Sequence, residues 1–215
     1  KTFFEKEPDT IQWIDDFKKD SVLLDVGANI GVYSIYAALK IDKVWSVEPE
    51  SLNFAMLNLN IHDNGLSDKI TALPLSLHNK SAINNLNIHS LDWGGALNSF
   101  DKPIDQFGNY FKPKFKQGSY SITLDYLVNK IGKVDHLKID VDGNEEHILS
   151  GGSFSISERI FKSILIEIDE NLSTYNQMLE FLKKNGYILK SITQSTFHPE
   201  IFGSTKNHIF NREQK

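Results

Sequence analysis

The sequence predicts an α/β fold in which a mostly parallel sheet carries helices on both faces. Short apolar runs alternate with helix-like segments along the 215 residues, which is the pattern of successive βαβ units. Apolar residues make up 40% of the chain, enough for a substantial core at this size. Several apolar runs stop at acids or glycines, and ligands of an open parallel sheet bind beyond such strand ends. We therefore expect one domain over residues 1–215.

The first half of the chain contains three predicted strands, each stopped by its own signal. A glycine turn ends the first, Glu48 and Pro49 end the second, and Pro74 weakens the third. Residues 1–20 are expected to form a helical lead-in. The expected elements are strands 21–26, 43–47 and 69–75 and helices 31–40 and 51–62. The second helix is expected to turn one apolar face inward, formed by Leu52, Ala55, Met56 and Leu59.

The second half resumes the alternation after a different middle segment. The expected elements are strands 134–141, 162–168, 186–192 and 207–210 and a helix over 174–184. Residues 78–120 have no long helical pattern, although 82–89 fit an extra strand. A long stretch without regular structure inside a compact domain is usually functional or mobile. The segment is therefore expected to be either a functional insertion or a surface insertion.

Composition excludes several classes of protein. The chain has 14 Phe, 7 Tyr and 3 Trp with a net charge of −5, which excludes a disordered chain. The absence of Cys excludes a disulfide scaffold, and no apolar run approaches the ~20 residues of a membrane span. A pI of 5.8 argues against a nucleic-acid binder. We expect a cytoplasmic protein; the oligomeric state and any residues before Lys1 stay open.

Polar residues mark the expected carboxyl ends of five strands. If these strands are parallel, their ends form one polar rim beside a crevice. An acid after a single strand is unremarkable, because acids also cap the helix that follows. Five such endings predict a binding site. The residues are Asp25, Glu48, Ser76, Asp140, Asp142, Glu167 and Asp169.

The turn after the first strand is the most specific motif, and it runs from Asp25 to Gly31. Gly27 permits a tight turn, and Gly31 permits close approach at a helix start. Backbone N–H groups at such a start favour a carboxylate or phosphate. Glu48 follows Gly27 by about 20 residues, the offset at which an acid binds ribose hydroxyls. Loop, acid and strand context together predict a nucleoside-binding site.

The details of this turn favour one nucleoside over others. A dinucleotide fingerprint needs glycines at 29 and 32, where this chain has Asn29 and Val32. Asp25 is badly placed for a pyrophosphate and well placed for an ammonium group. A ligand with an amino acid at one end and adenosine at the other fits, which is S-adenosylmethionine. We expect its ribose at Glu48 and its adenine near Ser76 and Leu77.

At these residues the sequence resembles the FkbM family, a branch of the class I S-adenosylmethionine-dependent methyltransferases. The resemblance covers residues 20–210. Its blocks are DVGANIGVYS, SVEPE, PLSLHN, TLDYL, HLKIDVDGNEEHILSGG and ILIEIDE. It implies a Rossmann-like seven-stranded sheet with an antiparallel final hairpin. It also implies methylation of a hydroxyl on a sugar, glycan or secondary metabolite. The residues that it implies for cofactor contact are Asp25, Gly27, Asn29, Gly31 and Glu48.

Methylation of an alcohol needs a proton acceptor, which typically contributes about 10²–10⁴-fold. The candidates lie on the fourth-strand edge: Asp140, Asp142 and Glu145. Asp140 is expected to project from the strand end toward both cofactor and acceptor. Asp142 stands where the family often has Glu, and Asp-Gly also favours a plain turn. Glu145 is either catalytic or a first-turn charge that complements the helix dipole.

Other charged residues have two interpretations each. Lys138 shares a strand face with Asp140 and either serves the substrate side of the rim or forms a buried salt bridge. Glu167 is a candidate substrate contact. With Asp140 and Asp169 it also offers oxygen ligands for Mg²⁺; the primary expectation is a site without a metal.

The 78–120 insertion is the expected acceptor lid. Trp93 is a candidate for stacking on a sugar ring, and Asn98 for a polar contact with the acceptor. Lys112, Lys114 and Lys116 alternate, so they either hold a phosphate or form a solvated face.

Two alternatives keep the same fold. One is a nicotinamide-dependent oxidoreductase, against which Asp25, Asn29 and Val32 argue. The other is a non-catalytic module that binds S-adenosylmethionine. The leading hypothesis is an O-methyltransferase with a small-molecule or glycan acceptor and no nucleic-acid partner.

Overall fold

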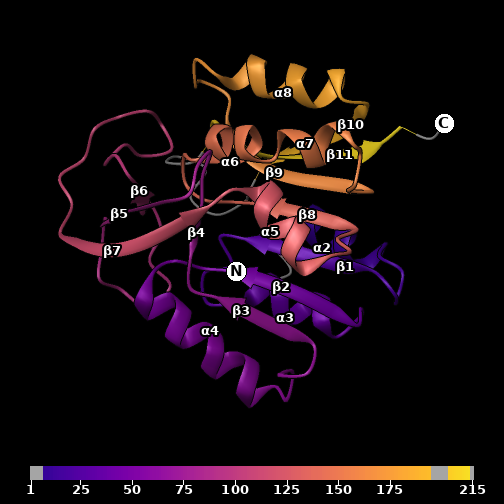
Figure 1. The fold of residues 1–215 in the computed structure, drawn as a ribbon, viewed down its shortest axis with the longest axis horizontal. Helices are drawn as coiled ribbons and strands as arrows, with labels where there is room; N and C mark the ends of the chain where they lie inside the picture. The colour runs from indigo at the N-terminus through magenta and orange to yellow at the C-terminus, as the bar shows by residue number, and fades with distance from the viewer. Residues whose placement is uncertain (1–6, 195–202, 214–215) are drawn as a thin grey trace.

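A computed structural model describes residues 7–194 and 203–213 and contains two sheets (Figure 1). The larger has seven strands in the order β10-β11-β9-β8-β1-β2-β3. The α/β class and the seven-stranded sheet are confirmed. The strands are β1 Val22–Val26, β2 Lys43–Val47, β3 Ile70–Leu73, β8 His136–Ile139, β9 Ser163–Asp169, β10 Tyr187–Gln194 and β11 Thr205–Arg212.

The pairing of the strands places their carboxyl ends at one edge. β1 pairs in parallel with both β2 and β8, β2 with β3, and β8 with β9. β11 runs antiparallel to β9 and to β10, which confirms the expected final hairpin. The residues after β1, β2, β8 and β9 therefore meet at the same side of the sheet.

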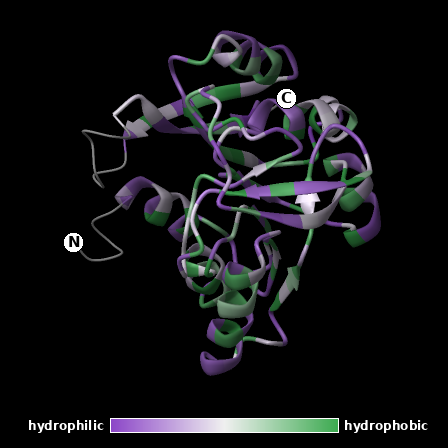
Figure 2. Ribbon diagram, turned by 90° about the vertical axis from the view of Figure 1, so that its left-hand side faces the viewer, coloured by the Kyte–Doolittle hydropathy of each residue, from purple (hydrophilic) through white to green (hydrophobic). Residues whose placement is uncertain are grey.

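Successive strand residues feed two hydrophobic cores, one on each face of the sheet. Leu24 and Val26 of β1 belong to one core, and Leu23 belongs to the other. This follows from the period of two along a strand. The first core packs against α5 Leu124–Ile131, α6 Glu145–Gly151, α7 Ser153–Ser157 and α8 Tyr175–Lys184. The second packs against α2 Pro8–Asp15, α3 Val32–Ala38 and α4 Ser51–Asp63. The helices mix hydrophobic and hydrophilic segments (Figure 2).

The buried face of α4 differs from the expected one. The helix buries Asn53, Leu57 and Ile61, whereas Leu59 is 54% exposed. The expectation was wrong because the helix has apolar residues on several faces, and the face that packs inward carries Leu57 and Ile61. Asn53 is buried because a loop distant in sequence satisfies its amide, as described below.

The middle segment is more regular than expected. It carries a second sheet in the order β4-β7-β5-β6, beside one end of the central sheet (Figure 1). These strands are β4 Ser76–Leu77, β5 Ala82–Ile88, β6 Ser99–Phe100 and β7 Phe115–Ile122. The extra strand over 82–89 is confirmed. The rest of the segment adds β6 and most of β7, while residues 89–98 and 101–114 lack helix and extended strand, as expected. The expected third strand also ends early, since the chain leaves the central sheet before Pro74 and Ser76 pairs with β7.

Within the described residues, none of the helices is both long enough and apolar enough to cross a membrane.

Candidate active site

The loop between β1 and α3 is held in a shape that two glycines permit. Gly27 has φ +83°, and a Cβ there would lie 1.7 Å from the carbonyl oxygen of Asp140. Gly31 has φ +91°, and a Cβ there would lie 2.4 Å from Leu57 Cδ1 of α4. Both positions need glycine for conformation and for space. Asn29 between them also adopts a left-handed conformation, with φ 51°.

Glu48 joins the end of β2 to this loop. Its carboxylate accepts hydrogen bonds from the N–H groups of Asn29 and Glu50, both at 2.8 Å. The residue is only 5% exposed. Burial raises the pKa of Glu48 to about 8, although the two N–H groups act in the opposite direction. Each oxygen accepts one of these bonds and retains capacity for another.

Asp25 and Lys138 form a buried charge pair beneath the loop. They are opposite each other in the β1–β8 register, and each side chain is 1% exposed. Lys138 Nζ lies 3.9 Å from Asp25 Oδ1 and 2.6 Å from Asp140 Oδ2. Ser34 of α3 donates to the other Asp25 oxygen at 2.6 Å. This packing favours the buried salt-bridge interpretation of Lys138, and it places Asp25 under the loop rather than on an open surface.

The charged side chains of Asp25, Lys138 and Asp140 shift one another's pKa values. Burial acts to lower the pKa of Lys138, but the Asp140 and Asp25 carboxylates outweigh it and raise that pKa. Burial raises the pKa of Asp25, against the opposing influence of Lys138 and Ser34. Lys138 therefore carries its charge, and it holds a cation beside Asp140, whose side chain is 25% exposed. Of the two acids beside Lys138, Asp140 is the one that faces outward.

The turn after β8 uses its acids to hold its own backbone. Glu145 begins α6, is 4% exposed, and accepts from the N–H groups of Val141 and Gly143. Burial raises the pKa of Glu145 to about 7. Asp142 adopts φ 58° and accepts the N–H of Leu97 at 2.6 Å. Both acids therefore hold the backbone of the turn, and Asp140 is left as the candidate whose partly exposed carboxylate pairs with a lysine instead.

Three acids converge at this edge, but not the three that the sequence indicated. Carboxylate oxygens of Asp140, Asp142 and Glu167 lie within 4.8 Å of one another. Asp169 is absent from this group, so the expected set of Asp140, Glu167 and Asp169 is wrong. The Asp169 carboxylate accepts instead from Ser204 and Thr205, because the antiparallel β11 begins beside it. Burial and the Asp140 carboxylate raise the pKa of Glu167 well above its ordinary value.

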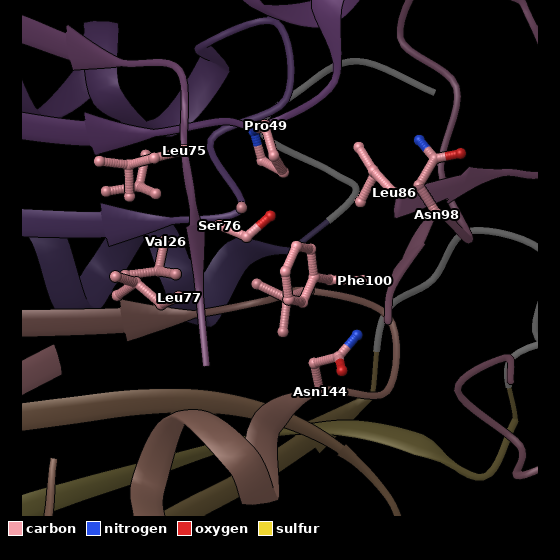
Figure 3. Close-up of a pocket in the computed structure, with 12 residues that line it drawn as sticks. Val26, Pro49, Leu75, Ser76, Leu77, Leu86, Asn98, Phe100 and Asn144 are labelled. Atoms are coloured by element: carbon pink, nitrogen blue, oxygen red, sulfur yellow. The ribbon is translucent and has the colours of Figure 1, made fainter. Parts of the chain in front are cut away.

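A pocket lies between the strand ends and the second sheet. It is a small pocket, with a cavity volume of about 40 Å³. Val26, Pro49 and Ser76 lie on one side, and Leu86, Asn98 and Phe100 on the other (Figure 3). The remaining lining residues are Gly27, Val47, Leu75, Leu77, Val141 and Asn144. An apolar lining with a few amides suits a flat heterocycle.

The predicted insertion residues divide between two places. Asn98 lines the pocket, and its side-chain oxygen accepts the N–H of His89. Trp93 is 59% exposed, outside the pocket lining. Lys112, Lys114 and Lys116 are all exposed, as a solvated face would be.

Several site residues had no signal in the sequence. Phe100, Pro49 and Asn144 line the pocket because the second sheet folds over the strand ends. Asn53 belongs to α4 and binds the insertion. The sequence signal for Asn53 was its place in a largely apolar helix, because a buried amide needs hydrogen-bond partners.

The chain is similar to known proteins in sequence pattern and in fold. The family described as "Methyltransferase FkbM domain" matches residues 25–189. No curated protein sequence matches the chain.

Solved structures share the fold at low identity. Precorrin-6y C5,15-methyltransferase from Geobacter metallireducens is 14% identical, with a TM-score of 0.57, over 97% of this chain and 87% of that one. An rRNA methylase from Streptococcus thermophilus is 10% identical, with a TM-score of 0.57, over 100% and 98%. M. capricolum TrmK, in complex with S-adenosyl-homocysteine, is 12% identical, with a TM-score of 0.55, over 96% and 68%.

Proposed function

The chain belongs to the FkbM methyltransferase family and is an S-adenosylmethionine-dependent methyltransferase, and from that premise we propose that it methylates a hydroxyl of a sugar, a glycan or a secondary metabolite. The oxidoreductase and the non-catalytic module are set aside by the family. What remains is to assign residues to the cofactor and the acceptor.

The cofactor half of the proposal rests on the loop, the acid and the pocket. Gly27, Asn29 and Gly31 would border the amino-acid end through close approach of the loop, because their own N–H groups already donate within the protein. Glu48 retains acceptor capacity for ribose hydroxyls. The pocket beside Ser76 and Leu77 supplies an apolar slot for the adenine. When bound, S-adenosylmethionine supplies an electrophilic methyl group.

The acceptor half rests on Asp140. Its carboxylate is partly exposed at the end of β8, and Lys138 holds it at 2.6 Å. An ionised, oriented carboxylate at this point can accept the proton that an alcohol loses during attack. Asp142 and Glu145 hold the backbone of the turn. Glu167 lies close enough to Asp140 to accept a hydrogen bond from a second hydroxyl of the substrate. This exposed, ion-paired Asp140 is the observation that carries the assignment.

The charge of the site supports a neutral acceptor over a nucleic acid. Asp140, Asp142 and Glu167 gather three carboxyl groups within 4.8 Å, and Lys138 pairs with Asp140. The raised pKa of Glu167 favours its protonated form. Sugar hydroxyls can hydrogen-bond to carboxyl groups in either form, whereas a phosphate backbone gains no attraction from an acidic cluster with a single lysine. We therefore propose a polyhydroxylated acceptor, although four of the similar folds belong to proteins described as RNA methylases or putative RNA methylases.

The test is transfer of a labelled methyl group from S-adenosylmethionine to a panel of acceptors. The panel contains sugars and nucleotide sugars, a macrolide alcohol, and total RNA. We expect label in a carbohydrate or alcohol, with the new methyl on oxygen by NMR. Labelled RNA, or a methyl on nitrogen or carbon, would contradict the proposal.

A further inference from the structure

The insertion tip, residues 93–98, is bound by an amide from the opposite side of the site. Asn53 of α4 accepts the N–H of Gly94 through its side-chain oxygen and donates to the carbonyl of Gly95, both at 2.9 Å. Asn53 is 2% exposed. Both ends of its amide therefore hydrogen-bond to two adjacent residues that lie more than forty positions further along the chain.

The tip is held to two further segments that border the site. Asn29 of the glycine loop donates to the carbonyls of Gly94 and Gly95, both at 3.3 Å. The N–H of Leu97 donates to Asp142 in the turn after β8, at 2.6 Å. One short segment therefore links the cofactor loop, α4 and the acidic turn.

Unusual backbone conformations gather at these contacts. Asn29, Leu97 and Asp142 have φ of 51°, 65° and 58°. Residues other than glycine rarely adopt this left-handed region. Such conformations persist where the surroundings hold them, and they concentrate at functional sites. Two of the three residues hydrogen-bond to each other. The docked tip is therefore a held conformation that depends on its partners.

We propose that Asn53 is a positioning residue that seats the insertion tip across the glycine loop. Docked there, the tip fixes the acceptor-side residues Trp93 and Asn98, and it slows exchange of the bound cofactor. The acceptor part of this proposal rests on the proposed function, but the docking does not. Asn53 acts through the tip, because its amide is already committed to Gly94 and Gly95.

The test compares three variants of the full chain. Asn53→Leu keeps the size and removes both hydrogen bonds. Asn53→Asp keeps the acceptor for Gly94 and loses the donor to Gly95. Asn58→Ala is the matched control, since Asn58 is an exposed amide of the same helix that donates to the carbonyl of Phe54, one turn earlier. The probes are amide hydrogen exchange and stopped-flow release of S-adenosylhomocysteine.

We expect Asn53→Leu to exchange faster over residues 93–98 and to release S-adenosylhomocysteine about tenfold faster, the effect of losing two hydrogen bonds. Exchange in β1 should stay unchanged, Asn53→Asp should be intermediate, and Asn58→Ala should match the wild type. Wild-type exchange at the tip would overturn the proposal. So would faster exchange throughout the chain, the mark of a merely structural role. If Asn53→Leu fails to fold, Asn53→Asp decides by the same readouts.

The outcome is separable from the proposed function. Both probes work without an acceptor, so a failure to methylate any hydroxyl would leave the exchange result intact. Conversely, an undocked tip in the wild type would leave the assignment of Asp140 standing.

Discussion

At the scale of single residues, the site is built from acids with different neighbours. Glu48 and Glu145 are buried against backbone N–H groups. Asp25 lies beside a buried lysine, and Asp140 reaches from that lysine toward solvent. Because surroundings decide what a carboxyl group can do, these acids are expected to respond differently to substitution.

Glu48→Ala removes a partner of the glycine loop and the proposed ribose contact. We expect it to weaken S-adenosylhomocysteine binding by about 1–3 kcal/mol, the cost of a lost hydrogen-bond partner. Titration calorimetry measures this, with Glu146→Ala, an exposed acid of α6, as the control. An unchanged dissociation constant would remove Glu48 from the cofactor site.

Asp140→Asn keeps the size of the side chain and removes its capacity to accept a proton. We expect turnover to fall by at least about 10²-fold, while S-adenosylhomocysteine affinity changes less than about threefold, within one hydrogen bond's range. Steady-state kinetics with the acceptor found in the panel measures this. Wild-type turnover in the variant would exclude Asp140 as the base.

At the scale of elements, the glycine loop is fixed by what lies against it. The carbonyl of Asp140, at the end of β8, occupies the space that a side chain at Gly27 would need. The loop, β8 and the acidic turn are thus packed as one unit. A change in the loop is expected to disturb all three.

Gly27→Ala tests this packing against a glycine of similar conformation. Gly65 has φ +66°, but nothing lies within 4 Å of a Cβ there. We expect Gly65→Ala to cost about 1–2 kcal/mol from backbone strain alone. Gly27→Ala should cost more than about 4 kcal/mol, because overlap adds to strain. Urea denaturation compares the two, and equal losses would contradict the packing argument.

The sequence predicted elements whose signals are local. The β1 turn, the α4 start and the β8 acids follow from residues adjacent in the chain, and the structure has each. It did not predict the second sheet, since β5 and β7 pair across an insertion of polar and aromatic residues. Nor did it predict the buried face of α4, because Asn53 finds its partners in the insertion. For the same reason Asp169 was misplaced, as its partners are Ser204, just before β11, and Thr205, the first residue of β11.

At the scale of the whole molecule, buried acids make stability depend on pH. Burial raises the pKa of Glu48 to about 8 and that of Glu145 to about 7, from an ordinary value of 4.5. Above pH 4.5 the folded chain therefore holds protons that the unfolded chain has lost. The free energy of unfolding falls as pH rises through this window, and it levels off above the folded pKa values.

Thermal unfolding between pH 7.5 and 8.5 tests this dependence. Burial lowers the pKa of His78, His136 and His208, so their opposing contribution fades within about one pH unit above their ordinary value of 6.5. We expect Tm to fall across the range, by roughly 2–4 °C for each kcal/mol lost. Glu48→Gln, which cannot ionise, should flatten the slope. A Tm that rises with pH would contradict the burial of ionisable glutamates at these positions.

The most direct test of the account is a crystal structure of the chain with S-adenosylhomocysteine. We expect the adenine in the pocket between Ser76 and Phe100, the ribose hydroxyls at Glu48, and the amino-acid end along Gly27–Gly31. The sulfur should face Asp140. Density for the ligand anywhere else, with that pocket closed by side chains, would contradict the assignment of both the cofactor site and the base.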